Sequence, residues 1–367
     1  MSWLLLCFTL LYVAFLVLYP FRWAKARKLT PNYSLPDFYV YSYEFHLHTQ
    51  FSYDSLGKPE DVIASMQAQD IDFVIVTDHD NDTIKNFLSS DRLLAGVERK
   101  INDERGEILG DLIEVDGLKV IAHPFKEKYR WKLSRDKNYF VEAIDLKDAL
   151  LESKFRLFLF LIPALFLYPF LKERALALLR KVIDLQNIAK RYIKDGWENP
   201  VVGGLDHHVK IYIREVGLRF LFPHYRHSFA LMRNFLLSDR KVENSKDFID
   251  AVKKNLSVVS FCDKPSFVWV EGKDLYIQTP YENTLVFLEG AQELCFDGSC
   301  AFAKLSAGVY VIYGYRYLFR LGRLYLGLSP LFFTAVEVGN GGKTSAGGDK
   351  TEDTSEGKKQ SSCPEGF

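Results

Sequence analysis

Two histidines separated by a single residue, His46 and His48, stand in the segment EFHLHTQFSYDS, which covers residues 44–55. On a strand, side chains two positions apart point to the same face, so both imidazoles can bind one metal ion, and Glu44 would share that face. The pair alone is weak evidence, because histidines also meet by accident on half-buried strands. Whether the pair indicates a metal site therefore depends on whether other metal-binding residues of the chain lie near it.

Other residues that bind metals stand where further apolar runs end. His79 closes FVIVTDH, Glu98 closes LLAGVE and His123 closes LKVIAH, while Asp206 and His208 repeat the two-residue spacing after VVGG. If these runs are parallel strands of a barrel, their C-terminal ends converge on the face that holds the active site in such folds. Imidazoles and carboxylates without cysteine suit Zn, Mn, Fe or Mg. Seven or more such ligands exceed what one ion uses, so they predict two or three ions bridged by a carboxylate.

The order of these motifs resembles the polymerase and histidinol phosphatase (PHP) family of metal-dependent phosphoesterases. The resemblance rests on HLHT at 46–49, TDH at 77–79, GVE at 96–98, AHP at 122–124 and GLDHH at 204–208. It implies a distorted seven-stranded (β/α)7 barrel that binds up to three ions, with Glu98 bridging two of them and Glu98 and Asp206 serving at the catalytic centre. The ligands that it implies are His46, His48, His79, Glu98, His123, Asp206 and His208.

Two positions depart from the family pattern. Glu44 stands where the family usually has Asp, and SYD at 52–54 stands where it usually has Ser-Asp-Gly. Asp54 supplies the remaining metal ligand only if its loop is shifted by one residue, so a third ion stays open. His207 should point away from the face of its two neighbours. Lys126 is a candidate phosphate contact, although a solvated lysine is the simpler interpretation.

These residues predict a phosphoesterase that hydrolyses a small phosphomonoester or nucleotide by a metal-activated water. Manganese, zinc or iron are the expected ions, and magnesium is also compatible. Two alternatives stay open, a non-catalytic scaffold held at the membrane and a hydrolase of non-phosphate esters. Lys plus Arg and Asp plus Glu number 47 each, so the chain has no overall basic field for duplex nucleic acid. The expected partner is a small phosphorylated substrate.

A chain of 367 residues is long enough for one large domain and a smaller one. Runs rich in Val, Ile and Phe alternate with helical patterns over 38–260, as expected for an α/β barrel with buried parallel strands. Short strands joined by Gly and Asp turns predict a small all-β domain over 261–338. Within it, the turn Asp297-Gly298 predicts a hairpin that sets Cys295 opposite Cys300. The tail at 339–367 has almost no apolar residues and is predicted to be disordered.

Residues 1–28 predict a membrane anchor with a basic flank. The stretch from Trp3 to Phe21 is uncharged and is long enough as a helix to cross a hydrocarbon core of ~30 Å. The lysines and arginines at 22–28 favour a cytoplasmic catalytic domain, whereas a disulfide at Cys295 would favour an oxidising compartment. Ala24-Lys25-Ala26 is also a weak signal-cleavage pattern.

A second apolar stretch, 157–171, lies in an insertion at 150–200 and contains two prolines. Predicted metal ligands precede and follow it in the sequence, and one cluster needs both sets on the same side of a membrane. The stretch must therefore enter and leave on one side, as a hairpin dipping into the bilayer or an interfacial helix, unless it is a helix buried in protein.

Overall fold

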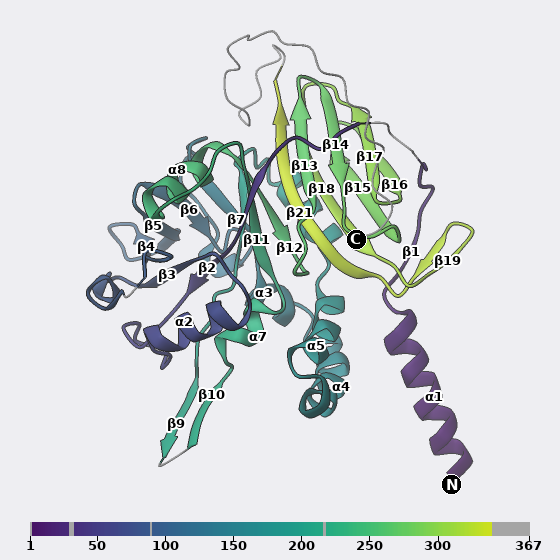
Figure 1. The fold of residues 1–367 in the computed structure, drawn as a ribbon, viewed down its shortest axis with the longest axis horizontal. Coiled ribbons are helices and arrows are strands. Elements are labelled where there is room, and N and C mark those ends of the chain that lie inside the picture. Colours follow the sequence, from purple (N-terminus) through teal and green to yellow (C-terminus); the bar gives the residue numbers. More distant parts are fainter. Residues whose placement is uncertain (1, 29–32, 89, 216–217, 340–367) are drawn as a thin grey trace.

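The computed structural model describes residues 2–28, 33–88, 90–215 and 218–339, so nearly all of the tail predicted to be disordered lies outside the described residues. Its main element is a mixed sheet of 13 strands with helices around it, which confirms the predicted α/β class (Figure 1). The strand order is β16-β15-β18-β21-β12-β11-β2-β3-β4-β5-β6-β7-β8.

The consecutive strands β2 to β8 carry most of the predicted site, and their apolar runs are buried, as parallel strands covered on both faces require. Strands β2, β3 and β4 are parallel to one another, as are β6, β7 and β8, while β5 is antiparallel to both of its neighbours. The bounds are β2 (Tyr39–Leu47), β3 (Phe73–His79), β4 (Leu93–Asn102), β5 (Ile108–Val115), β6 (Leu118–Ala122), β7 (Phe140–Asp145) and β8 (Val201–Gly204).

This sheet curls without closing into the predicted (β/α)7 barrel. Among the described strands no ladder joins β8 to β2, because β8 ends at Gly204 and only the segment after it reaches β2. There, Leu205 N donates to Phe45 O at 2.9 Å and His48 N donates to His207 O at 3.0 Å. A second departure is β5, which joins β6 through the tight turn 116–117 instead of a helical crossover.

Helices cover both faces of the curled sheet. On one face, α8 (Ser245–Lys254) places the ring of Phe248 4.2 Å from Phe73 and 5.3 Å from Tyr43, between ring centroids. Burial of one such aromatic side chain stabilises the fold by about 1.5–3 kcal/mol. The opposite face carries the larger apolar core. The other helices and 3₁₀ turns are α2 (Pro59–Ala68), η1 (Thr83–Phe87), η2 (Glu127–Tyr129), α3 (Leu146–Leu151), α5 (Glu173–Leu176), η3 (Ala177–Val182), α6 (Leu185–Lys194) and α7 (Tyr225–Phe229).

The C-terminal strands extend the same large sheet and add a three-stranded sheet, β13-β14-β17. The prediction of a hairpin around Asp297-Gly298 is wrong, because the strands before and after this turn belong to different sheets. Cys295 on β16 lies opposite Phe287, whereas Cys300 on β17 lies opposite Gln278, and the Cys295 thiol is free. The strands are β11 (Arg233–Ser238), β12 (Leu256–Ser260), β13 (Phe267–Glu271), β14 (Asp274–Gln278), β15 (Thr284–Gly290), β16 (Leu294–Asp297), β17 (Cys300–Lys304), β18 (Gly308–Arg316) and β21 (Ser329–Val338).

The N-terminal helix α1 (Ser2–Leu18) has 17 residues and is shorter than the predicted span. At 1.5 Å per residue it is about 26 Å long. The segment after it is part of the fold, since β1 (Phe21–Trp23) pairs with β20 (Leu324–Leu326), which in turn pairs with β19 (Phe319–Leu321). In the described chain, one helix is long and apolar enough to cross a membrane, α4 (Lys154–Leu171), and α1 is a shorter apolar helix.

Candidate metal centre

The carboxylate of Glu98 is the point on which four imidazoles converge. Its oxygens lie 3.1 Å from His79 Nδ1, 3.3 Å from both His46 Nε2 and His48 Nε2, and 3.4 Å from His123 Nε2. His79, the last residue of β3, and Glu98, within β4, are register partners on these parallel strands, which sets them at the same level. Glu98 is almost fully buried, so this cluster lies inside the protein, not on its surface.

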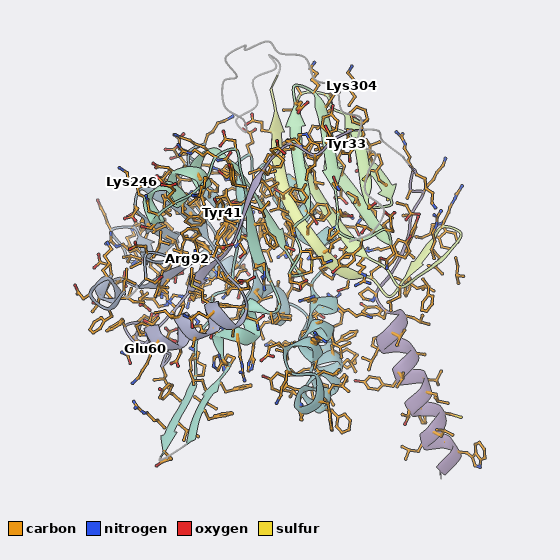
Figure 2. The ribbon with its side chains drawn as sticks, viewed as in Figure 1. Tyr33, Tyr41, Glu60, Arg92, Lys246 and Lys304 are labelled. Atoms are coloured by element: carbon orange, nitrogen blue, oxygen red, sulfur yellow. The ribbon has the colours of Figure 1, made fainter. Side chains whose placement is uncertain are left out.

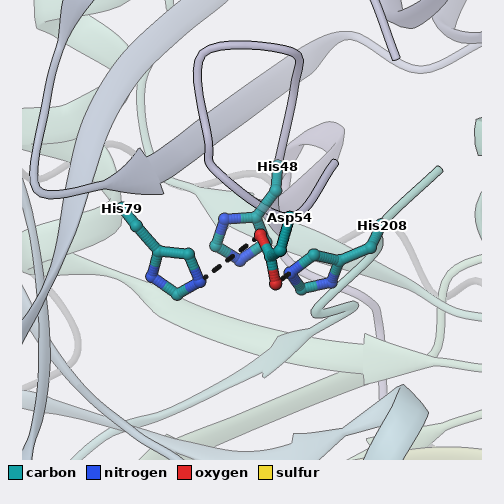
Figure 3. Close-up of side chains that lie close together, drawn as sticks. All are labelled: His48, Asp54, His79 and His208. Atoms are coloured by element: carbon teal, nitrogen blue, oxygen red, sulfur yellow. Dashed lines mark ion pairs between the residues drawn. The ribbon is translucent and has the colours of Figure 1, made fainter. Parts of the chain in front are cut away.

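The residues after β8 complete the cluster from the opposite side. Asp206 Oδ1 lies 3.5 Å from His48 Nε2 and 3.2 Å from His208 Nδ1. His208 Nε2 is 2.8 Å from Asp54 Oδ2, and the other Asp54 oxygen is 3.8 Å from His79 Nε2 (Figure 3). The Asp54 loop thus reaches the cluster despite its offset from the family pattern.

Three residues of the cluster have backbone conformations that L-residues rarely adopt. The φ angle is +63° at His46, +49° at His123 and +43° at Asp206. Each such residue costs about 1–3 kcal/mol and persists only where the surrounding fold imposes it. At His46 it coincides with a register shift between Phe45 and Leu47, which turns the imidazole toward Glu98. The strand ends are therefore bent to aim these side chains inward.

Several atoms of the cluster are buried without a hydrogen-bond partner. They include Nε2 of His46 and His48 and both carboxylate oxygens of Glu98. Buried polar atoms are nearly always hydrogen-bonded, and an unsatisfied one costs about 1–3 kcal/mol. Divalent cations would satisfy these atoms, so the residues fit a metal centre. The sets with ligand atoms within 4.8 Å of one another are His48/Asp54/His79/His208, His46/His48/Glu98, Glu98/Asp111/His123, His46/His123/Glu142/Asp145 and Asp145/Asp148/Asp206.

A second layer of carboxylates orients two of the imidazoles. His46 Nδ1 is 2.6 Å from Glu142 Oε1, and His123 Nδ1 is 2.9 Å from Asp145 and 3.2 Å from Asp148. Because Nδ1 donates to a carboxylate, Nε2 is left as the metal-binding nitrogen. Sequence reasoning missed this layer, although FVEAID at 140–145 is an apolar run with an acid at its end, like those that were recognised.

Glu98 and His48 are held in the protonation states that bind a cation. Burial opposes ionisation of Glu98, but the surrounding imidazoles, His46 first, hold the pKa of Glu98 well below its usual range. Burial lowers the pKa of His48 to about 3, so this imidazole stays neutral, which is the form that ligates metals. Burial and the nearby charge of Glu98 raise the pKa of Asp111 to about 6.

Three other residues considered in the sequence lie outside this cluster of ligand atoms. Glu44 does not share the His46 face, because the register shift breaks the alternation; its fully buried carboxylate interacts with the charge of Arg233. His207 points away, with Nδ1 2.6 Å from Ser228 Oγ. Lys126 Nζ is 2.7 Å from Asp148 Oδ1 and reaches only the outer layer.

A cavity of about 340 Å³ opens beside His123. Its lining contains two cations, Lys126 and Arg191, which are ion-paired with Asp148 and Glu152, and apolar surface from Ile188. Lys147, which sequence reasoning also missed, is ion-paired with Asp206. The cluster therefore has a neighbouring cavity with charged and apolar walls, in which carboxylates outnumber the cations.

No family model matches this chain, and no curated protein matches it. Among solved structures, it is similar to a two-domain protein from Bacteroides vulgatus ATCC 8482 that contains a predicted PHP-like metal-dependent phosphoesterase. The two chains are 13% identical, and the match covers 85% of this chain and 99% of that one with a TM-score of 0.31. At this level of similarity, the roles of the residues rest on the geometry of this chain.

Proposed function

We propose that this chain is a metal-dependent phosphoesterase whose ligands are His46, His48, Asp54, His79, Glu98, His123, Asp206 and His208. The observation that carries the proposal is the buried Glu98 carboxylate, with four imidazole nitrogens 3.1–3.4 Å from its oxygens. The unpartnered buried nitrogens and oxygens around it support the binding of a cation at this site. Glu98 would bridge two ions, and Asp54 would allow a third.

The residues of the chain have separate tasks in this proposal. Divalent ions, when bound, lower the pKa of water and stabilise charge on phosphate oxygens. Glu142 and Asp145 hold the ligand imidazoles in one tautomer and orientation. Ile188 and Leu151 offer apolar contact to the organic part of an ester in the cavity beside His123, whose two cations, Lys126 and Arg191, are paired with Asp148 and Glu152. A phosphate ester with an apolar organic group would place that group against Ile188 and Leu151 and its phosphate on the bound ions.

We also propose that the protein is held at a membrane by α1. Large apolar side chains of α1 are exposed, among them Trp3 at 79% and Leu11 at 67%. Soluble monomers rarely leave such continuous apolar surface in water. Lys181 Nζ fixes the other end of the helix to the domain, since it donates to the carbonyls of Leu16, Val17 and Tyr19 at 2.7–3.1 Å.

The test uses the full chain purified in detergent, with metal content and hydrolysis of an aryl phosphate measured in the same preparation. Glu98→Gln keeps the side-chain shape and removes the central charge, so we expect lower metal content and turnover reduced by orders of magnitude. Glu60→Gln is the matched control, because Glu60 is exposed in the first turn of α2 and lies outside the cluster.

Three results would contradict the proposal. Less than one ion per chain in the parent protein would indicate a scaffold, not an enzyme. If the sites are fully occupied by metal but no phosphate ester in a broad panel is hydrolysed, the substrate belongs to another class of ester. Equal effects of Glu98→Gln and Glu60→Gln would show that Glu98 does not hold the ions.

A further inference from the structure

Two apolar segments leave the sheet at the same edge that carries the metal residues. Strand β7 ends at Asp145 and continues through α3 into α4. Strand β8 is followed by Asp206 and His208 and then by a hairpin of β9 (Ile211–Glu215) and β10 (Leu218–Phe222). In Figure 1, the hairpin and α4 project from the lower side of the molecule, the side from which α1 also extends.

Helix α4 runs along this edge of the fold. Near its start, the carbonyl of Leu159 accepts a hydrogen bond from Tyr12 of α1; near its end, Tyr168 OH lies 2.9 Å from His227 Nε2 of α7. The buried residues of α4 are Phe160 and Ala164, one turn apart. The opposite face is an exposed apolar stripe with helical spacing, formed by Phe155, Phe158, Ile162, Phe166 and Phe170.

The β9–β10 hairpin has the same two-sided construction. Tyr212 and Leu221 are register partners on the face toward the protein, where Leu221 is buried and Lys58 Nζ lies 5.6 Å from the Tyr212 ring centroid. The other face exposes two apolar cross-strand pairs, each residue 42–46% exposed. These pairs are Ile213 with Phe220 and Ile211 with Phe222.

The base of the hairpin contacts the metal cluster directly. Lys210 N donates to Phe222 O at 3.0 Å, which closes the hairpin. The Lys210 ammonium donates to the carbonyl of Asp54 at 2.7 Å. Only two residues separate His208 from the first hairpin residue, so whatever covers the hairpin lies within roughly 10 Å of chain from a metal ligand.

Positive side chains accompany both apolar surfaces. Exposed lysines and arginines stand at both ends of α4, at the base of the hairpin and on β9. Each Lys or Arg close to an anionic membrane contributes about 1 kcal/mol of attraction. The combination of an apolar face with a basic surround is typical of elements that lie in the interface plane of a bilayer. The residues are Lys154, Lys172, Arg174, Lys210 and Arg214.

We propose that α4 and the β9–β10 hairpin hold the metal-bearing edge of the sheet against an anionic bilayer, so that the site takes phosphate esters displayed by that surface. The substrate class is then a phosphorylated membrane amphiphile. This last step rests on the proposed phosphoesterase function, whereas the docking itself does not.

The bilayer is favoured over a second copy of the chain because the surface is continuous with α1. The ring of Phe15 on α1 lies 5.9 Å from Phe160 on the buried side of α4. The bilayer that surrounds the exposed residues of α1 would therefore also contact α4. An isologous protein contact would have to cover a helix stripe, a separate hairpin face and α1 together.

The docking experiment uses the full chain with its five cysteines replaced, reconstituted into phosphatidylcholine vesicles with or without phosphatidylglycerol. Single cysteines at Phe220 and Phe166 carry an environment-sensitive dye, and Lys304→Cys is the control, since Lys304 lies at the opposite end of the molecule (Figure 2). We expect nitroxides on shallow acyl positions, ~5–10 Å into the interface, to quench the dyes at 220 and 166 but not at 304. Aqueous iodide should quench only the dye at 304.

Quenching of the 220 dye by iodide and not by lipid nitroxides would overturn the docking. Energy transfer between labelled chains without lipid quenching would assign the surface to a second copy and would overturn it equally. Both readouts are independent of catalysis, so they stand whether or not the phosphoesterase assay succeeds.

The substrate class is tested by the ratio of turnover on vesicle-borne phosphatidic acid to turnover on soluble phenyl phosphate. The double substitution Ile213→Asp with Phe220→Asp should lower this ratio at least about tenfold, since burial of even one such side chain is worth that factor. An unchanged ratio in a parent that hydrolyses phenyl phosphate would refute the substrate class while leaving the proposed function intact. Absence of turnover on both substrates, with lipid quenching present, would refute the function and the substrate class but leave the docking intact.

Discussion

Replacement of Glu142 by glutamine tests whether the outer carboxylates set the metal affinity. Glu142 Oε1 lies 2.6 Å from His46 Nδ1, and its Oε2 accepts from the backbone N–H of His123 at 3.0 Å. Both neighbours are donors, and glutamine offers only one carbonyl oxygen to the two of them. One donor is therefore left facing an amide NH₂, and the other loses the charge of its acceptor.

The magnitude follows from these two contacts. A hydrogen bond to a charged group contributes about 1.5–3 kcal/mol, against about 0.5–1.5 kcal/mol for a neutral one. Loss of a partner that orients a ligand histidine typically weakens metal binding about 10–100-fold, or about 1.4–2.7 kcal/mol. We expect Glu142→Gln to fall in this range, because its two contacts hold ligands from two different strands.

The assay is competition for zinc or manganese between the metal-stripped full chain and a fluorescent chelator. Gly204→Ala provides an independent route to the same loss, because a methyl group on Gly204 would come within 1.5 Å of Glu142 Oε1 and force that carboxylate aside without removing its charge. Glu60→Gln, at an exposed position on α2, is the control. If Glu142→Gln binds metal as tightly as the parent and melts at the same temperature, the orienting role is refuted.

Two further predictions concern the contacts of α7 and α1. Burial, aided by His224 and Arg226, lowers the pKa of His227 to about 4, so the unfolded chain takes up a proton that the folded chain does not as the pH falls from about 6.5 toward 4, and stability should decline in that window. His227→Gln should make the thermal midpoint less dependent on pH there, and an identical pH profile would contradict the assignment. Lys181→Met keeps the aliphatic stem but leaves the α1 carbonyls uncapped, so tryptic cleavage at Arg22 should become faster than in the parent, whereas equal rates would show that the cap does not hold α1.

The ligand types and their convergence could be predicted because each stands where an apolar run ends. Parallel strands place their C-terminal ends on one edge, so Glu98 and His79 had to be neighbours once the runs were recognised as strands. The side of the sheet toward which His46 points could not be predicted from the regular alternation of side chains along a strand. Its φ of +63° and the register shift break the pattern, which is why Glu44 was wrongly placed on the same face.

The pairings that failed are those set by contacts distant in the sequence. The sequence Asp297-Gly298 is typical of a hairpin turn. However, β16 pairs with β15 and β17 pairs with β14, so the turn connects strands of two different sheets. The hairpin β9–β10 has no turn signal of comparable strength and was not predicted. The segment after α1 was taken as a flank, yet β1 is held by β20, about 300 residues later in the chain. Local propensity does not choose between such partners.

The distribution of strain suggests why chemistry and apolar surface share one edge. The cluster combines three positive-φ residues with unpartnered buried atoms, and each of these features costs about 1–3 kcal/mol. Those costs fall at strand ends, where the ladder bonds of β2 and β8 already stop and the backbone is free to bend. The same freedom allows long insertions after β7 and β8, which carry α4 and the β9–β10 hairpin. Contact between these insertions and a bilayer would stabilise the bent strand ends. Bound cations would supply partners for the buried unpartnered atoms of the cluster.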